Sequence, residues 1–255
     1  DKITKRIDNL INGNEKTIIN AVKIAQKTIQ MMFNGITTEK LDHESAKICA
    51  ELSTENPLYS FLGARILVSN LHKKTENSFV SKMNYINDQM GKMSPIFMEY
   101  VNNNREELDN LINYEKDFLL DYFGFKTLER AYLIKLGDKI IERPQDMWLR
   151  VACCIHHNDL ENTKKTYHQL SNLYYTHASP TLFNSGNIRC QLASCFLLGT
   201  EDNLDGITET WRQVSKISKW GGGIGVSVSN IRSKGSLIRG TNGPSTGIIP
   251  MLKVY

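Results

Sequence analysis

Apolar side chains recur at helical spacing through the first 75 residues. This spacing predicts an amphipathic helix over 15–33, a second helix over 38–49 and a third over 57–73. The hydroxyl of Thr37 or Thr38 can cap the second helix, and a proline suits the opening turn of the third. We therefore expect a helical module here. The apolar positions of its first helix are Ile18, Ile19, Val22, Ile24, Ala25, Ile29 and Met32.

The helical pattern continues to about residue 176. Phe123 and Phe125 precede apolar positions up to Leu136, which predicts an aromatic-anchored helix, and a further helix is expected to open at 142–144. On that helix Cys153 and His157 would share one face at i, i+4 spacing. A structural zinc site needs four ligands, however, and no second pair in the sequence completes this one. We therefore interpret both residues as structural.

The last third of the chain changes pattern. Residues 191–198 form a short apolar run typical of a buried strand, and 224–231 alternate β-branched residues, which predicts a second strand. Apolar residues at helical spacing lie between them, preceded by two candidate N-caps, Asp202 and Asn203. Strand, helix and strand form a βαβ unit, which builds parallel sheets or barrels. The apolar positions of the helix are Leu204, Ile207, Trp211, Val214 and Ile217.

Charge and composition narrow the class of protein. The chain has 255 residues and a net charge of only +4, and its basic and acidic residues are interleaved. This distribution does not indicate a basic surface for nucleic-acid binding, but it is compatible with small anionic ligands such as nucleotides. No apolar run approaches the ~20 residues that span a bilayer, and no signal peptide opens the sequence. We therefore expect a cytoplasmic protein without a nucleic-acid or membrane partner.

The cysteine content indicates reduced thiols. An odd number of cysteines without a framework spacing argues against a secreted disulfide scaffold. One or two of them are therefore candidates for redox chemistry. The five cysteines are Cys49, Cys153, Cys154, Cys190 and Cys195.

Several short motifs follow one another along the chain. Upstream lie A-R-I-L-V-S-N-L-H-K and D-Y-F-G-F-K-T-L-E-R-A-Y-L. The last third contains H-A-S-P-T-L-F-N, Q-L-A-S-C-F-L-L, G-G-I-G-V-S-V-S, I-R-S-K-G-S and G-T-N-G-P-S. Each motif alone is weak, but in this order they resemble the large, catalytic subunit of class I ribonucleotide reductase over essentially the whole chain.

The resemblance implies a fold. It predicts a mainly α N-terminal part, made of an ATP cone and a helical domain, followed by the first strands of a ten-stranded α/β barrel. The expected domains are a partial ATP-cone regulatory domain over 1–75, a helical domain over 76–189 and the start of the catalytic barrel, with a specificity-effector loop, over 190–255. The match begins inside the cone, at D-K-I-T. The basic strand and turn that open the cone in the family are therefore expected to lie outside this sequence.

The implied reaction reduces ribonucleoside diphosphates to deoxyribonucleoside diphosphates by thiyl-radical chemistry with a redox dithiol. Loss of a ribose hydroxyl consumes two electrons, and a dithiol passing to a disulfide supplies two. Cys195 matches one redox thiol of the family, although an apolar strand is also a usual place for an inert core thiol.

A partner for Cys195 is not expected among the other cysteines. Cys190 lies ~16 Å away along an extended segment, too far for a disulfide. The resemblance places the partner thiol beyond Tyr255. It also places the radical cysteine in a motif that this sequence does not contain, so we expect the chain to be catalytically incomplete.

Ser179, Ser194 and Gly223 match substrate contacts of the family. Without the resemblance, Ser179 suits a Ser-Pro turn or a helix cap, and Ser194 suits an ordinary strand position. The glycines at 221–223 and 225 follow a helix and precede a strand, the reverse of the order in Rossmann and P-loop phosphate sites. We therefore expect these glycines to cap the helix and allow close packing, with Gly223 bordering the substrate.

Asp202, Lys219 and Arg232 match the family's site for the specificity effector, a deoxynucleoside triphosphate or ATP. The resemblance implies that the carboxylate accepts from the sugar hydroxyl and that the cations meet phosphates. Asp202 also suits helix capping, and Lys219 suits a helix C-terminus. The glycine-rich loop 233–247 resembles the family's effector-responsive loop. Between Cys195 and Asp202 the chain is one residue shorter than the family pattern.

Lys2, Thr38, Asp42 and Lys73 match positions of the cone that contact the activating or inhibiting adenine nucleotide, ATP or dATP. The residues alone also fit plain helix surface for Lys2 and Lys73 and an N-cap for Thr38.

The resemblance also implies partners. It predicts a ribonucleotide reductase small subunit that carries the radical cofactor, a thioredoxin- or glutaredoxin-like reductant, and a homodimer or higher homo-oligomer. Two nucleotide sites would then regulate activity by biasing subunit arrangement. No metal and no resident cofactor are expected in this chain. The alternatives are a non-catalytic nucleotide-sensing module built around the cone and a purely structural helical domain.

Overall fold

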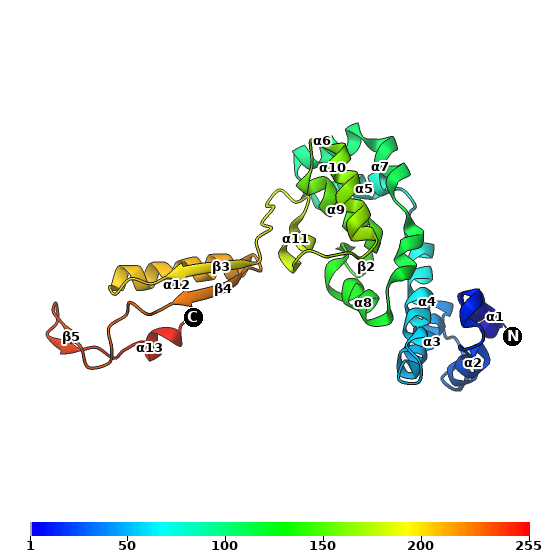
Figure 1. Ribbon diagram of the computed structural model, residues 1–255, viewed down its shortest axis with the longest axis horizontal. Coiled ribbons are helices and arrows are strands. Elements are labelled where there is room, and N and C mark those ends of the chain that lie inside the picture. The colour runs from blue at the N-terminus through cyan, green and yellow to red at the C-terminus, as the bar shows by residue number, and fades with distance from the viewer. Residues whose placement is uncertain (1) are drawn as a thin grey trace. The chain divides into compact units, whose positions relative to one another are not determined.

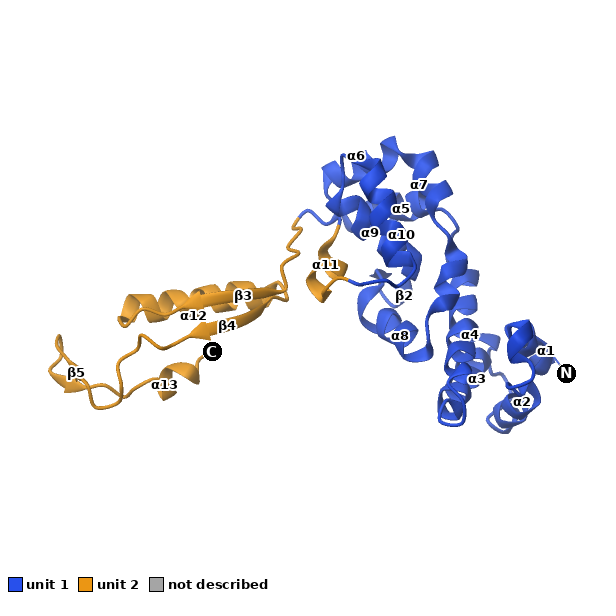
Figure 2. Ribbon diagram, viewed as in Figure 1, with its two compact units in different colours: residues 1–176, 186–188 blue, residues 177–185, 189–255 orange. Residues whose placement is uncertain are grey.

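The computed structural model describes residues 2–255 and divides into two compact units (Figures 1 and 2). Unit 1 comprises residues 1–176 and 186–188, and unit 2 comprises 177–185 and 189–255. Helices make up most of unit 1, whereas unit 2 contains the parallel strands (Figure 1). The described chain is therefore mostly helical with a few short strands, as the sequence predicts.

Unit 1 is built from short and medium helices joined by tight connections. Its 3₁₀ turns are Gly13–Glu15 and Tyr114–Leu119, its π-helical turn is Leu128–Tyr132, and its hairpin is β1 (Lys135–Leu136) and β2 (Lys139–Ile140). Its α-helices are α1 (Lys2–Asp8), α2 (Ala21–Gln30), α3 (Thr38–Leu52), α4 (Leu58–Lys74), α5 (Phe79–Met90), α6 (Pro95–Asn103), α7 (Arg105–Leu111), α8 (Tyr122–Thr127), α9 (Pro144–Ile155) and α10 (Leu160–Ser171).

The three helices predicted in the first 75 residues are present with shifted ends. The first begins at Ala21 rather than residue 15, because the Asn20 side chain accepts a hydrogen bond from Lys23 N at 3.0 Å and so caps α2 there. Thr37, not Thr38, caps α3. Pro57 is the N-cap of α4, whereas we predicted it to be the first residue of that helix.

Helix α4 is the central element of unit 1. It packs along α3 and also contacts α8, while α2 packs on α3 and α1 on α2. Burial of a full aliphatic side chain stabilises a fold by about 1.5–3 kcal/mol, so this helix contributes a large share of the unit's stability. Its fully buried apolar residues are Leu62, Ala64, Ile66 and Val68.

Two buried ion pairs lie in unit 1. Lys82 forms an ion pair with Asp146, and the Tyr114 hydroxyl donates to the same carboxylate at 2.7 Å. Arg150 Nε lies 2.6 Å from Glu142 Oε1. Burial raises the pKa of Asp146 to about 6, although the Lys82 ammonium opposes this shift. Removing one partner would leave an uncompensated charge in the core, so these pairs hold the helices in one arrangement.

The helix predicted across 123–136 is interrupted. Helix α8 ends at Thr127, the chain widens into the π-helical turn, and Leu136 lies in β1. The amide of Leu133 bonds to the Leu128 carbonyl at 3.0 Å, which is the i→i−5 spacing of a π turn. Ile134 N then donates to the buried Glu142 carboxylate, so the chain leaves the helix at this point.

Cys153 and His157 do not share a helix face, contrary to the sequence expectation. Helix α9 ends at Ile155 with His156 as its C-cap. Burial raises the pKa of the Cys153 thiol, as expected of a core thiol.

Unit 2 contains the predicted βαβ unit. β3 and β4 pair in parallel, β5 and β6 pair antiparallel, and α12 packs against β3 and β4 (Figure 1). The elements are α11 (Ser179–Asn184), β3 (Cys195–Gly199), α12 (Leu204–Lys219), β4 (Gly223–Ser227), β5 (Leu237–Ile238), β6 (Gly243–Pro244) and α13 (Ile249–Leu252).

β3 is shorter than the predicted strand 191–198. Two side chains of α11 hold the preceding carbonyls, with Thr181 Oγ1 donating to Leu192 O at 3.0 Å and Asn184 Nδ2 donating to Gln191 O at 2.8 Å. These bonds keep the segment out of the ladder. β4 likewise ends at Ser227, before a turn, instead of continuing to residue 231.

The β3–β4 pair is half-buried rather than fully buried. Along both strands, exposed residues alternate with half-buried ones such as Phe196 and Ile224. Leu197, on the other face, is 90% exposed. One face of this strand pair is therefore open in the described residues, although parallel sheets are normally covered on both faces.

Both ends of α12 have clear stop signals. Asn203 caps the N-terminus by accepting from Gly206 N at 2.7 Å, so Asp202 is not the cap. At the other end Gly221 has φ +76° and donates to Ser218 O, while Gly222 donates to Ile217 O. This is a Schellman motif, and it confirms the expected glycine cap.

Candidate catalytic and nucleotide-binding sites

Cys195 opens β3 on the uncovered face of the sheet. Its register partner is Gly223, whose amide donates to Ser194 O at 2.7 Å. Ser194 Oγ donates to Cys195 Sγ across 3.6 Å. The thiol is exposed, so it is not the buried core thiol that an apolar strand also allowed. Cys195, Ser194 and Gly223 thus form one cluster, in which the sulfur is accessible to a ligand.

Ser179 is connected to this cluster through α11. It is the first residue of that helix and is half-buried. The Thr181 and Asn184 bonds described above join α11 to the segment that leads into Ser194. Three of the predicted substrate positions therefore lie on elements that contact one another within unit 2.

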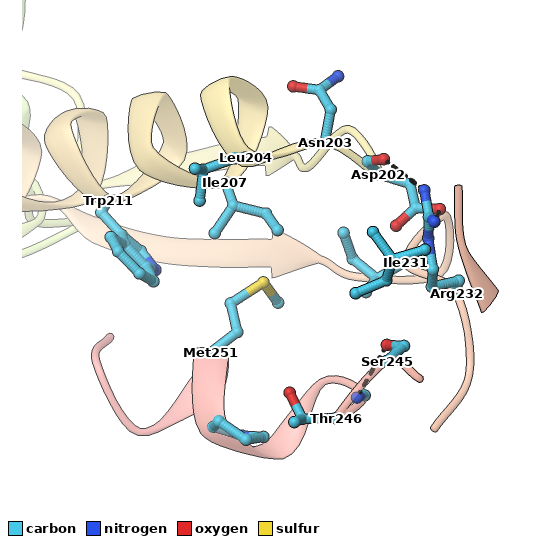
Figure 3. A pocket seen from close by; sticks show the side chains of 13 residues that line it. Asp202, Asn203, Leu204, Ile207, Trp211, Ile231, Arg232, Ser245, Thr246 and Met251 are labelled. Atoms are coloured by element: carbon cyan, nitrogen blue, oxygen red, sulfur yellow. Dashed lines mark hydrogen bonds and ion pairs between the residues drawn. The ribbon is translucent and has the colours of Figure 1, made fainter. Parts of the chain in front are cut away.

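A cavity of about 440 Å³ lies beside the N-terminal half of α12 (Figure 3). Asp202 and Arg232 stand at one side of it, and Met251 of α13 faces Ile207 across it (Figure 3). Its lining residues are Asp202, Asn203, Leu204, Ile207, Trp211, Ile231, Arg232, Ile238, Ser245, Thr246, Gly247, Pro250 and Met251.

Arg232 binds Asp202 directly. Its Nε lies 2.8 Å from Asp202 Oδ2, its Nη2 lies 3.2 Å from Asp202 O, and its Nη1 donates to Leu237 O at 3.3 Å. A guanidinium has five N–H groups, so two remain for a ligand anion. Asp202 Oδ1 receives no hydrogen bond within residues 2–255 and can accept one from a ligand hydroxyl. The pair therefore offers donors and an acceptor side by side.

Lys219 does not join this cavity. It ends α12, about 12 Å along the helix axis beyond Trp211 and ~22 Å from Leu204 at the Asp202 end of the cavity. Its Nζ lies over the Trp220 ring, 5.6 Å from the centroid, and Arg189 approaches the same ring at 5.2 Å. The three predicted effector residues are thus separated within one chain into a pair and a distant lysine.

Unit 1 contains a second cavity, of about 720 Å³, that brings together the four cone residues predicted from the sequence. Lys2, Thr38, Asp42 and Lys73 all line it. They come from α1, α3 and α4. Its other lining residues are Ile3, Arg6, Ile7, Ile29, Met32, Leu41 and Ser45.

Two cations approach Asp42 in this cavity. Arg6 Nη2 lies 3.1 Å from Asp42 Oδ2, and Lys73 Nζ lies 3.9 Å from the same oxygen. Arg6 also donates to Ser69 Oγ at 3.0 Å. The sequence analysis missed Arg6, although its i, i+4 spacing from Lys2 on one helix could have indicated it. Cations beside an apolar wall are chemically suited to a nucleotide.

Within residues 2–255, no cluster of His, Cys, Asp and Glu has the arrangement of a metal site. The helices described there also lack the length and apolar character that crossing a bilayer requires.

Two domain families of one enzyme match the chain in sequence. The ribonucleotide reductase all-alpha domain matches residues 118–189, and the ribonucleotide reductase barrel domain matches residues 193–255. The fold and these matches define the class: an all-α region followed by the start of a ribonucleotide reductase barrel.

Relatives that match over the whole of this chain identify the family more specifically. The chain is 51% identical to the ribonucleoside-diphosphate reductase large subunit of Variola virus, 48% to that of Arabidopsis thaliana and 45% to the large chain of Schizosaccharomyces pombe. All of this chain is covered in each case, but only 34%, 32% and 33% of those proteins. The chain thus spans about a third of the length of the curated relatives it matches. It belongs to the ribonucleotide reductase large-subunit family, which confirms the resemblance seen in its motifs.

Proposed function

We propose that this chain forms part of a ribonucleoside-diphosphate reductase that converts ribonucleoside diphosphates to deoxyribonucleoside diphosphates. The observation that carries the proposal is the accessible Cys195 thiol beside Gly223 on the open face of a parallel strand pair. Family membership supports it, because the relatives carry that enzyme's name. A thiol in this position can meet a sugar that enters over the uncovered face.

Cys195 would act as one half of a redox dithiol. Two thiols become one disulfide and give up two electrons and two protons. The C2′ hydroxyl leaves as water and a hydrogen takes its place, so the electrons and protons balance. The second thiol, and the cysteine that carries the thiyl radical, would come from other parts of the protein. The radical cofactor of a small subunit would generate that radical, which removes the 3′ hydrogen.

Ser179, Ser194 and Gly223 would hold the substrate. A serine hydroxyl both donates and accepts, so it can bond to a diphosphate oxygen or to a ribose hydroxyl. A Cβ on Gly223 would lie 3.1 Å from Ser194 O, and glycine leaves this approach to the sulfur free of side-chain atoms. The cluster would position the sugar and leave the electron transfer to the dithiol.

The unit 2 cavity would bind a deoxynucleoside triphosphate or ATP as the specificity effector. Asp202 Oδ1 would accept from the sugar hydroxyl, and the remaining N–H groups of Arg232 would bind phosphate. Lys219 is too far along α12 to reach the phosphates that Arg232 would bind, so it would contact the phosphates of an effector only from a second copy of the chain. This geometry favours the expected homodimer or higher homo-oligomer.

The unit 1 cavity would bind ATP or dATP and adjust overall activity. Lys2, Arg6 and Lys73 would bind phosphates, and Asp42 and Thr38 would contact the sugar or base. The apolar side chains from α1, α2 and α3 would pack on the base. A small subunit and a thioredoxin- or glutaredoxin-like reductant would be the protein partners, and the intact protein would be cytoplasmic.

A non-catalytic nucleotide-sensing module is the second candidate. The unit 1 cavity favours it, because that cavity needs none of the thiol chemistry of unit 2. Turnover separates the two. The reductase proposal predicts dithiol-dependent formation of deoxynucleotide by the intact protein with its small subunit, whereas the module predicts nucleotide binding alone.

Titration with labelled nucleotides tests the effector sites. The proposal predicts that dATP fills both cavities and that dTTP fills only the cavity of unit 2, so dATP should show about twice the stoichiometry of dTTP. Equal stoichiometry, with full competition between the two nucleotides, would exclude the proposed unit 1 site. Absence of binding by either nucleotide would exclude both proposed sites.

A further inference from the structure

Trp211 lies at the end of the unit 2 cavity away from Arg232. It follows Leu204 by seven residues on α12, which is about 10 Å along the helix axis. Its indole projects from the helix on the same side as Ile207 and toward the region of Met251 (Figure 3). The cavity therefore has a charged end at Asp202 and Arg232 and an aromatic end at Trp211.

The wall between these ends is apolar. The phosphates of a nucleotide gain nothing from such a wall, whereas a flat base packs well against aliphatic and aromatic side chains. A nucleotide with its phosphates at Arg232 would therefore place its base toward Trp211. Besides Trp211, the apolar lining residues are Leu204, Ile207, Ile231, Ile238, Pro250 and Met251.

The indole nitrogen of Trp211 has an unused hydrogen bond. Nε1–H is shielded from solvent and has no acceptor in the part of the chain that the structure describes. The Tyr255 ring meets the indole edge to face, with centroids 6.3 Å apart, and the Tyr255 hydroxyl is also buried without a partner in this region. Buried polar groups are normally bonded. An unsatisfied N–H on a residue that lines the cavity, with a second unsatisfied group in contact with that residue, indicates a ligand whose flat edge carries hydrogen-bonding atoms.

We propose that Trp211 is a specificity-determining residue of the effector site. The base packs against the apolar wall with its edge toward Trp211, and the Trp211 Nε1–H donates to an acceptor on that edge, while Arg232 holds the phosphates. Binding then includes a shift of the side chains that cover Nε1. This inference rests on the proposed nucleotide site, and it adds a contact with the base to the sugar and phosphate contacts of Asp202 and Arg232.

Three probes test the inference on the intact protein: labelled dTTP, an abasic deoxyribose triphosphate and inorganic tripolyphosphate. Trp211→Phe keeps a ring but removes the N–H, so dTTP should bind about fivefold more weakly, the cost of one hydrogen bond. Trp211→Leu also removes the ring that lines this end of the cavity and should weaken dTTP binding further. Neither variant should change the affinity for the abasic triphosphate or for tripolyphosphate. Arg232→Ala should weaken all three probes.

Trp220→Phe is the matched control, because Trp220 is the C-cap of α12 and does not line the cavity, so the exchange should leave all three affinities unchanged. Thermal melting of each variant checks that it is folded. Wild-type dTTP affinity in folded Trp211→Phe and Trp211→Leu overturns the inference, and so does an equal loss for tripolyphosphate. Failure of the wild-type protein to bind any probe instead rejects the proposed effector site itself.

Discussion

Cys195 on β3 and Gly223 on β4 are register partners in a parallel strand pair. The Gly223 amide donates to the carbonyl of Ser194, the residue just before the thiol, at 2.7 Å. This bond fixes the backbone on which the sulfur stands. The position of Cys195 therefore depends on the glycine turn that ends α12 as well as on β3 itself.

That dependence predicts the effect of Gly222→Ala. A Cβ at this position would lie 2.6 Å from Ile217 Cγ2 and 2.7 Å from Phe196 Cε2, so α12 and β3 would have to separate. We expect overpacking to lower the free energy of unfolding of unit 2 by about 1–3 kcal/mol. Gly199→Ala is the control, because nothing lies within 4 Å of a Cβ there. Chemical denaturation measures both, and an unchanged midpoint for Gly222→Ala would contradict the packing described.

The Asp202–Arg232 pair predicts a change in selectivity. Asp202→Ala or Arg232→Ala removes a charge-assisted contact, which weakens effector binding about tenfold or more. Substrate choice should become looser, with a smaller change in overall rate. Arg212→Ala is the control, because Arg212 pairs with Glu209 outside the cavity. Competition between two ribonucleoside diphosphates, with and without dTTP, measures the effect. An unchanged response in Arg232→Ala would exclude this site.

Two neighbouring lysines allow a test of whether the unit 1 cavity is a defined binding site. Lys73 lines the cavity, whereas Lys74 forms an ion pair with Glu39 and does not line it. Lys73→Met should therefore weaken dATP binding at this site about tenfold, and Lys74→Met should leave it close to wild type. Calorimetric titration with dATP compares them. Similar losses in both variants would indicate general electrostatics instead of a defined site.

The Glu15–Arg65 pair predicts a pH-dependent stability. Arg65 Nη1 and Nη2 donate to the two carboxylate oxygens at 2.5 and 2.8 Å, and these hydrogen bonds hold the pKa of Glu15 below its ordinary value of 4.5. A lowered pKa in the folded state stabilises the fold above the ordinary value, and this stabilisation is lost as pH falls through the lowered value. Glu15→Gln should thus cost about 1–3 kcal/mol of unfolding free energy at pH 7 and much less in acid.

The exposed Lys23–Glu55 pair supplies the control for that prediction. Surface pairs contribute little, so Glu55→Gln should change the unfolding free energy by less than about 1 kcal/mol at either pH. A Glu15→Gln effect that stays constant from pH 7 into acid would contradict the assignment.

The sequence predicted most of the architecture. The helical module, the βαβ unit and the glycine cap after Lys219 depend on local periodicity and turn chemistry, and the structure contains all three. The ends of β3 could not be predicted, because Thr181 and Asn184 remove residues 191 and 192 from the ladder through tertiary hydrogen bonds. The interrupted helix at 128–132 has the same kind of cause, a buried carboxylate that is distant from the local pattern.

The candidate sites show the same limit. Motifs indicated Lys2, Thr38, Asp42 and Lys73, and the structure brings these four residues to one cavity. Arg6 and Trp211 also line the cavities, yet in the sequence Trp211 is an ordinary position on an amphipathic helix and Arg6 lies before the first predicted helix. Only the tertiary fold shows that Arg6 meets Asp42 and that the Trp211 nitrogen is left without an acceptor among the described residues. The roles proposed for all of these residues, and the division into three domains, remain predictions.

The exchange Cys195→Ser in the intact protein, assayed with its small subunit and a dithiol reductant, tests the central claim most directly. The account predicts that formation of deoxynucleotide stops while dTTP still binds, and that the control Cys190→Ser leaves turnover intact. Turnover at the wild-type rate by Cys195→Ser would contradict the account, because the sulfur would then have no part in the reduction.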